Sequence, residues 1–573
     1  MLLSFLVGAL FLVTPVPAST AFAPATSALA PPAPAPVPAG LPEAQAAPDD
    51  CGDPSAWATR AELTEGRETS SHREVMEFLD RAAACDHRMV RVTFGHSLEG
   101  RPLPLLVVSP RVVEDHAGEG VLPPSAAADL ASALVADDRL RVFIQANIHA
   151  GEVAGKESVL RLVRRIVAGE VELPADMDLL LAPIYNADGN EAVRLDHRPR
   201  QHGPVGGMGT RTNAMGLDLN RDQMKLDSPE ARSLARLLGE WAPHVLADLH
   251  TTNGTRHAYH LTYSPPLHPA TPESIDRFLR DEHFPRVTDA VEAEWGWHMW
   301  HYGNVFERDG QRGWWTFDHR PRFVTNYAGL RNRVGILSEA YSYLEFMDRI
   351  LATERFVDQI LEDLAPRTRE VRALVETEWA RDLRGTRIPI RAGFPDTAPD
   401  TEILMGDVET DLHPGTGAPL LRRTDVVVPD TMPAWIAFEG TEWARVPAAY
   451  LLPDPDPQVT ERLRAHGIRL DPMAESDAGQ TVQVEVFRVT GVESAPREFQ
   501  GRVERTLEGE WHLEERSLPP GTLRIDLSQP EARLAVLLLE PRADDGLVNW
   551  AILGADAEAG DELPLLREPV PDP

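Results

Sequence analysis

Histidine and glutamate side chains follow three apolar segments that are typical of buried strands. His149 and Glu152 stand after the first segment, His250 directly after the second and Glu339 directly after the third. Because ligand sites in α/β sheets lie outside the carboxyl ends of the strands, we expect these side chains to converge. Two imidazoles and one carboxylate with an open fourth position are the ligands of a hydrolytic zinc site, and a further carboxylate nearby can accept a proton from the acidified water.

The His-x-x-Glu spacing has little weight when taken alone. A chain with 19 histidines and many glutamates contains about one or two such pairs by chance. The pairs His96/Glu99 and His512/Glu515 have the same spacing, but no other candidate ligand is arranged around either of them. The argument for His149 therefore depends on the residues that end the other strands.

The segments around these residues alternate between strand and helix patterns. Short apolar runs predict strands at 89–94, 103–108, 140–148, 177–184, 245–249 and 334–337. Apolar residues at helical spacing predict helices at 71–84, 155–166, 228–241 and 272–295. This alternation predicts an α/β fold with a central mixed sheet and helices on both faces.

The C-terminal part of the sequence has a different pattern. Beyond about residue 366, short strand-like runs are broken by Pro, Gly and Asp, at 425–428, 435–438, 482–489, 501–507 and 534–539. We therefore predict a catalytic domain over 49–366 and a β-rich accessory region over 385–573.

The N-terminal segment has the pattern of a secretory signal. A short apolar run ends in small residues, so we predict a signal peptide over 1–18 and an Ala/Pro-rich linker over 19–48. The run is too short for a membrane span. Cys51 and Cys85 are either a disulfide or two buried thiols. We expect a secreted, periplasmic or cell-surface protein with no stable membrane span.

Length and charge restrict the remaining function classes. A chain of 573 residues exceeds the length at which one hydrophobic core usually keeps growing, so we expect two or more globular units. Its formal net charge of -33, with no Lys/Arg-rich stripe, repels phosphate backbones and excludes nucleic acid as an expected partner.

The motifs between about residues 71 and 342 resemble those of a known family, the zinc carboxypeptidases of the M14 peptidase class. The resemblance is carried by His-Ala-Gly-Glu at 149–152, Pro-Ile-Tyr-Asn-Ala-Asp-Gly at 183–189, Arg211, Gly-Leu-Asp-Leu-Asn-Arg at 216–221, His250 and Glu339. It implies that His149, Glu152 and His250 bind Zn²⁺ and that Glu339 is the general base.

The same resemblance implies roles for five further residues. Arg211 corresponds to the donor that stabilises the oxyanion, and Asp218 to the carboxylate that orients the first histidine. Asn220 and Arg221 correspond to the pair that binds the terminal carboxylate of the substrate. Tyr327 is the candidate for the family's mobile tyrosine, although a packed aromatic ring is an equally good interpretation.

These observations predict a secreted zinc metallocarboxypeptidase that hydrolyses the C-terminal bond of a peptide or protein substrate. Two alternatives stay open at this point. One is a zinc-dependent amidase, deacylase or peptidoglycan-type endopeptidase on the same scaffold. The other is a catalytically inactive binding protein that uses its β-rich region.

Overall fold

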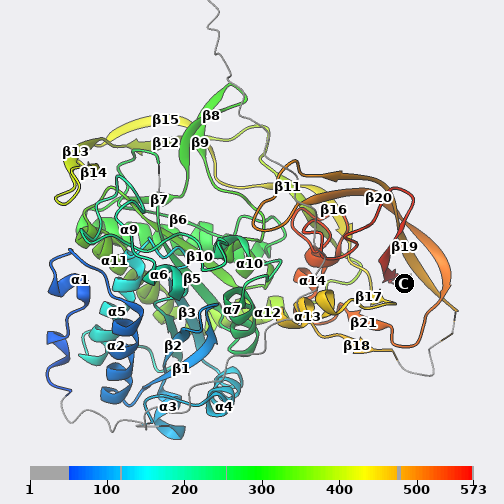
Figure 1. Cartoon of the computed structure of the whole chain (residues 1–573), viewed down its shortest axis with the longest axis horizontal. Coiled ribbons are helices and arrows are strands. Elements are labelled where there is room, and N and C mark those ends of the chain that lie inside the picture. Colours follow the sequence, from blue (N-terminus) through cyan, green and yellow to red (C-terminus); the bar gives the residue numbers. More distant parts are fainter. Residues whose placement is uncertain (1–50, 117–118, 253, 474–478, 480, 571–573) are drawn as a thin grey trace, which may run out of the picture. The chain divides into compact units, whose positions relative to one another are not determined.

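Figure 1 shows a computed structural model, which describes residues 51–116, 119–252, 254–473, 479 and 481–570. The predicted signal peptide and linker lie outside these residues. The central feature is an eight-stranded sheet with the strand order β1-β2-β4-β3-β5-β10-β6-β7. Its strands are β1 (Met89–His96), β2 (Pro102–Val108), β3 (Leu140–Ala146), β4 (Met177–Ala182), β5 (Val245–Thr251), β6 (Leu261–Ser264), β7 (Met299–His301) and β10 (Val334–Ala340).

The middle of this sheet is parallel. Strand β3 lies between β4 and β5, and β5 also pairs with β10, all in the same direction. All three of β3, β4 and β5 are buried along their whole length, as expected for strands that are covered on both faces. The carboxyl ends of β3, β5 and β10 therefore meet at one edge.

Helices cover both faces of the sheet, because alternate strand residues point to opposite sides. On β2, Leu105 belongs to one core cluster and Leu106 to the other. The cluster of Leu106 includes α2 (His72–Cys85), α5 (Ala154–Val167), α9 (Phe284–Trp295), α11 (Phe346–Leu364) and α12 (Thr368–Trp379). The cluster of Leu105 includes α4 (Pro124–Val135), α7 (Pro229–Glu240) and α10 (Val324–Leu330). The predicted α/β fold is confirmed.

The C-terminal part is rich in strands, as predicted. A six-stranded sheet contains β17 (Ala449–Leu452), β18 (Asp471–Pro472), β19 (Thr481–Ser494), β20 (Arg505–Ser517), β21 (Leu523–Asp526) and β22 (Glu562–Glu568). Smaller sheets contain β11 (Arg387–Gly393), β12 (Asp400–Met405), β13 (Val408–Leu412), β14 (Pro419–Arg423), β15 (Val428–Trp435) and β16 (Glu439–Arg445).

Some strand predictions in this part are wrong. The segment 534–539 lies in helix α14 (Ala532–Leu539), whose residues are all buried. A short apolar run cannot distinguish a buried helix from a buried strand by its pattern. The predicted strands at 425–428 and 435–438 each share only one residue with β15.

The two parts of the chain are joined by a shared sheet and a shared core. Strands β8 (Asn304–Arg308) and β9 (Gln311–Trp315) form a sheet with β12 and β15. The core cluster that covers the α7 face of the central sheet also contains residues of α14 and β17. The described residues accordingly belong to one compact unit.

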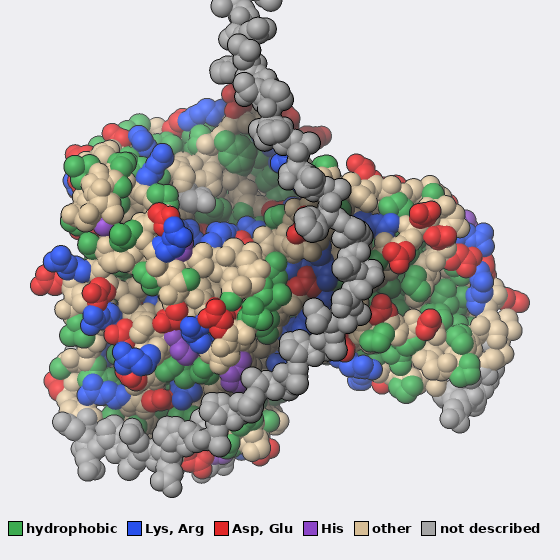
Figure 2. All heavy atoms as spheres, viewed as in Figure 1, with side chains coloured by type: hydrophobic (Ala, Val, Ile, Leu, Met, Phe, Trp, Pro, Cys, Tyr) green, Lys and Arg blue, Asp and Glu red, His purple; other side chains and the backbone are tan. Residues whose placement is uncertain are grey.

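Two further features bear on the sequence predictions. Cys51 and Cys85 form a disulfide. Among the described residues, no helix has both the length and the apolar content that crossing a bilayer requires. Figure 2 shows acidic and basic side chains intermingled over the face that it presents.

Candidate metal and substrate site

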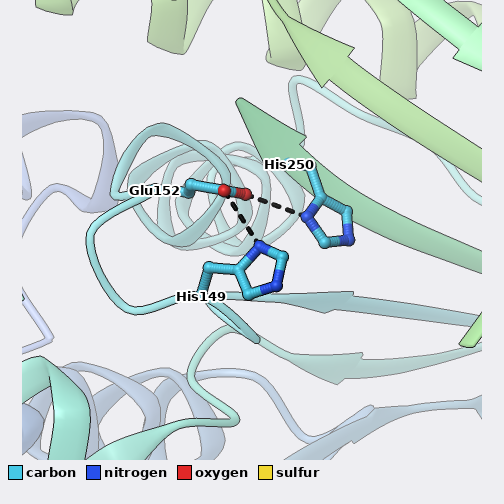
Figure 3. Close-up of side chains that lie close together, drawn as sticks. All are labelled: His149, Glu152 and His250. Carbon is cyan, nitrogen blue, oxygen red and sulfur yellow. Dashed lines mark hydrogen bonds and ion pairs between the residues drawn. The ribbon is translucent and has the colours of Figure 1, made fainter. Parts of the chain in front are cut away.

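Two histidines and one glutamate converge at the carboxyl edge of the sheet (Figure 3). His149 and Glu152 lie in the turn between β3 and α5, and His250 lies near the end of β5. The Nδ1 atoms of His149 and His250 are each 2.9 Å from a different oxygen of the Glu152 carboxylate. One candidate ligand atom from each residue lies within 4.8 Å of the other two, so these residues could hold a metal ion.

Each imidazole is oriented through its other nitrogen. The Nε2 atom of His149 lies 3.0 Å from Asp218 Oδ1, and that of His250 lies 2.7 Å from Asp248 Oδ2. A carboxylate that accepts from Nε2–H orients the ring so that Nδ1 is the nitrogen available to a metal. Both Nδ1 atoms thus face the centre of the triad.

The burial of Glu339 is the clearest sign that a cation is expected here. Its backbone pairs with that of His250 in the parallel register of β10 and β5, which brings the two side chains to the same edge. Burial raises the pKa of the Glu339 carboxyl well above its usual range, although the charge of His250 lowers it. The buried Oε2 atom of Glu339 has no hydrogen-bond partner among the described residues. Two imidazoles and the Glu152 carboxylate fit a zinc ion with an open fourth position, and the Glu339 carboxylate lines the same pocket.

The electrostatic surroundings shift the pKa of Glu152 in the opposite direction to that of Glu339. Burial raises the pKa of Glu152, but the charges of Arg198, His149 and His250 outweigh this effect and hold it well below its usual range. The lowered pKa favours the ionised carboxylate, which is the form that binds a metal.

A pocket of about 110 Å³ opens beside the triad. Its lining residues are His149, Glu152, Arg211, Asn220, Arg221, Thr251, Tyr302, Phe317, Phe323, Thr325, Leu337 and Glu339. The pocket therefore brings the candidate ligands His149 and Glu152 close to the Glu339 carboxylate and to two guanidinium groups.

The basic residues of the pocket are held by Asp218 and by an aromatic ring. Arg211 Nε donates to Asp218 Oδ2 at 2.8 Å, and its side chain is 39% exposed. The guanidinium carbon of Arg221 lies 3.8 Å from the centre of the Phe323 ring. Asn220 Oδ1 accepts from the backbone N–H of Val324 at 2.8 Å. These contacts fix the positions of both cations at the wall of the pocket.

The sequence model of the family described as zinc carboxypeptidase matches residues 75–262. Over these residues the chain is similar to the zinc carboxypeptidase family. The matched residues include His149, Glu152 and His250, and they end before Glu339.

Two curated relatives are named as carboxypeptidases. Carboxypeptidase 2 of Trichophyton rubrum is 26% identical over 459 residues, which cover 75% of this chain and 76% of the relative. Carboxypeptidase 2 of Trichophyton tonsurans is 24% identical over 465 residues, with the same coverage. A metallo-carboxypeptidase structure from Burkholderia cenocepacia is 16% identical, covers 52% of this chain and 69% of its own, and has a TM-score of 0.36. A score this low adds nothing to the fold described above.

The resemblance to zinc carboxypeptidases implied roles for several residues. Among these, only Tyr327 lies away from both the pocket and the triad. It lies in α10, and its side chain is fully buried in the core. Its hydroxyl lies 2.7 Å from His466 Nδ1 and accepts from Arg331 Nη1 at 3.0 Å. Tyr302 is the tyrosine that lines the pocket.

Three further residues of the candidate site were not predicted from the sequence. Asp248 stands two residues before His250 on β5. Because side chains alternate between the two faces of a strand, both lie on the same face. This spacing could have identified it. Arg198, which contacts Glu152, and Tyr302 come from irregular segments whose sequences carry no such signal.

Proposed function

We propose that this chain is a zinc-dependent metallocarboxypeptidase that removes residues from the free C-terminus of a peptide or protein. The observation that carries the proposal is that the pocket beside the candidate triad is lined by both Glu339 and Arg221. A ligand set, a base and a carboxylate-binding cation are the three groups that this reaction needs.

Each residue of the pocket has a distinct task in the proposed reaction. When bound by the triad, zinc supplies a Lewis acid that polarises the scissile carbonyl and makes a water molecule acidic. Glu339 accepts the proton of this water on its carboxylate and delivers it to the leaving amine. Arg211 donates to the oxyanion that develops on the carbonyl oxygen.

Arg221 and Asn220 provide specificity for a free C-terminus in this proposal. Burial lowers the pKa of Arg221, but arginine stays protonated in proteins, so the guanidinium can donate to a carboxylate as a cation. Among the described residues, it forms an ion pair only with Asp218, at 3.9 Å. Its stacking on Phe323 holds the plane of the group in one orientation, which favours bidentate binding.

Localisation and domain boundaries belong to the same proposal. The Cys51–Cys85 disulfide supports an oxidising compartment, and with the sequence pattern of 1–18 it favours secretion or a periplasmic or cell-surface location. We assign the catalytic domain to 49–366 and the β-rich region to 385–573.

A comparison of free and amidated peptides tests the activity. Amidation removes one partner of a charge-assisted contact and leaves Arg221 unpaired, so we expect cleavage about 30- to 1000-fold less efficient than for the free acid. Arg221→Ala should abolish most of this preference. Mass spectrometry over time should show stepwise loss of single C-terminal residues. Internal cleavage, or equal rates on both peptides, would favour the amidase or endopeptidase alternative.

A further inference from the structure

A larger cavity adjoins the small pocket beside the triad. Its volume is about 720 Å³, and Phe317 lines both this cavity and the pocket. The walls come from the segment that follows β9 and from the β-rich region, including β11 and the ends of β19 and β20. We define it as the outer cavity.

Partly exposed aromatic rings line part of the outer cavity, beside charged side chains. Phe394 and Phe438 stack with ring centres 4.1 Å apart, and both are half-buried, as is Phe317. Phe306, at 45% exposure, adds a fourth ring. Rings that stay accessible to water gain free energy when an apolar group covers them.

The charged groups of the outer cavity are largely paired with one another. Arg320 Nε donates to Asp318 Oδ2 at 2.7 Å, and His319 Nε2 lies 3.0 Å from Asp544 Oδ2. Arg505 donates to the backbone carbonyl of Gly554 at 2.9 Å. Such a surface favours a ligand of low charge with apolar side chains over a strongly ionic one.

We propose that the outer cavity binds the part of a peptide substrate that lies upstream of the cleaved bond. The preferred ligand is a peptide with an aromatic or large apolar side chain in this part. This inference rests on the proposed function. A pocket of about 110 Å³ has room for little more than the terminal residue, so the rest of the substrate must lie beyond its rim. Phe317 makes the outer cavity continuous with that rim. The β-rich region thereby becomes part of the substrate site.

Peptides of different length test the proposal. The substrates are an N-blocked dipeptide and octapeptides with the same two C-terminal residues, in which one phenylalanine is moved through the upstream positions. We expect kcat/KM for the best octapeptide to exceed that for the dipeptide about 5- to 30-fold, which corresponds to covering one or two aromatic rings. Phe394→Ala and Phe438→Ala should remove most of this advantage and leave dipeptide hydrolysis unchanged.

Trp443→Ala is the matched control, because it deletes an exposed aromatic ring of the β-rich region that does not line the outer cavity. It should keep the full length advantage. Equal kcat/KM for both substrates in the unaltered enzyme, or an unchanged advantage in Phe394→Ala and Phe438→Ala, would overturn the proposal.

A binding measurement separates this inference from the proposed function. The affinity of a fluorescently labelled octapeptide is measured with Glu339→Gln as the background, so the result does not depend on turnover. Weaker binding on addition of Phe394→Ala, at an unchanged melting temperature, supports the outer cavity even if hydrolysis fails. Equal affinity with and without Phe394→Ala would contradict it even in an active carboxypeptidase.

Discussion

At the scale of single residues, the site depends on carboxylates with opposite electrostatic surroundings. Glu152 faces two imidazoles and a guanidinium, which lower its pKa, whereas burial dominates at Glu339 and raises its pKa. A ligand must be ionised before the metal arrives, while a base must exchange a proton during the reaction. The different neighbours of the two glutamates therefore match their different proposed tasks.

The role of Glu339 can be tested by a change that preserves its shape. Glu339→Gln removes the proton acceptor, so we expect turnover to fall on the order of a hundredfold or more while bound zinc is retained. Turnover and metal content are measured on the same preparation. Glu345→Gln is the control, because Glu345 is the exposed residue before α11. If Glu345→Gln causes the larger loss, the base is assigned to the wrong residue.

The contact between Asp248 and His250 predicts an effect on metal affinity that can be measured without turnover. Asp248→Asn keeps the size of the side chain but weakens the acceptor that orients His250, so zinc affinity should fall about 10- to 100-fold. Competition with a chromogenic chelator measures this change. Asp178→Asn removes another buried carboxylate, one that bonds Ser109 and Arg139, and should leave zinc affinity unchanged. An unaltered affinity in Asp248→Asn would remove Asp248 from the site.

At the scale of elements, the strands β3, β5 and β10 could be predicted from the sequence, together with the convergence of the residues that follow them. This succeeded because each strand is a continuous apolar run that ends in an ionisable residue. The same reasoning failed at 534–539, where a buried helix has an apolar run of the same length. Tyr302 and Arg198 could not be predicted, because tertiary contacts alone determine the position of an irregular segment.

The segment between the site and α7 is anchored to the β-rich region by ion pairs. Asp227 accepts two hydrogen bonds from Arg502, each at 2.7 Å, and one from Arg462 at 2.8 Å. Burial raises the pKa of Asp227, but these arginines and Lys225 outweigh it and lower the pKa from 3.8 to about 2.

The lowered pKa of Asp227 predicts a pH-dependent stability. A carboxyl whose pKa is lower in the folded state stabilises the fold above its unfolded pKa, and this contribution is lost as the pH falls through the folded pKa. Asp227→Asn should therefore reduce the free energy of unfolding on the order of 2 kcal/mol at pH 7, with the difference vanishing between about pH 4 and 2. Urea unfolding across this range measures it. Asp309→Asn, at a 94% exposed side chain, should show no such trend; a constant difference for Asp227→Asn would contradict the argument.

At the scale of the whole molecule, the predicted catalytic and β-rich regions share one hydrophobic core. A single cluster contains Leu234 of α7, Tyr327 of α10, Leu452 of β17 and Leu537 of α14. Buried polar contacts accompany it, since Arg331 donates to the backbone carbonyl of His466 at 2.7 Å and Arg322 pairs with Asp545 at 2.7 Å. Unfolding either region alone would leave these buried charges without partners.

This shared core predicts that residues from both regions unfold in one cooperative transition. Arg322→Ala should lower the melting temperature of that transition as a whole, because it leaves the buried Asp545 without its ion-pair partner, at a cost of about 3–5 kcal/mol. Calorimetry of the full chain tests this. Arg312→Ala, which breaks an exposed pair with Asp430, is the control and should have little effect. Two separate transitions, of which Arg322→Ala moves only one, would mean that the β-rich region folds independently and that the shared cluster does not couple it to the site.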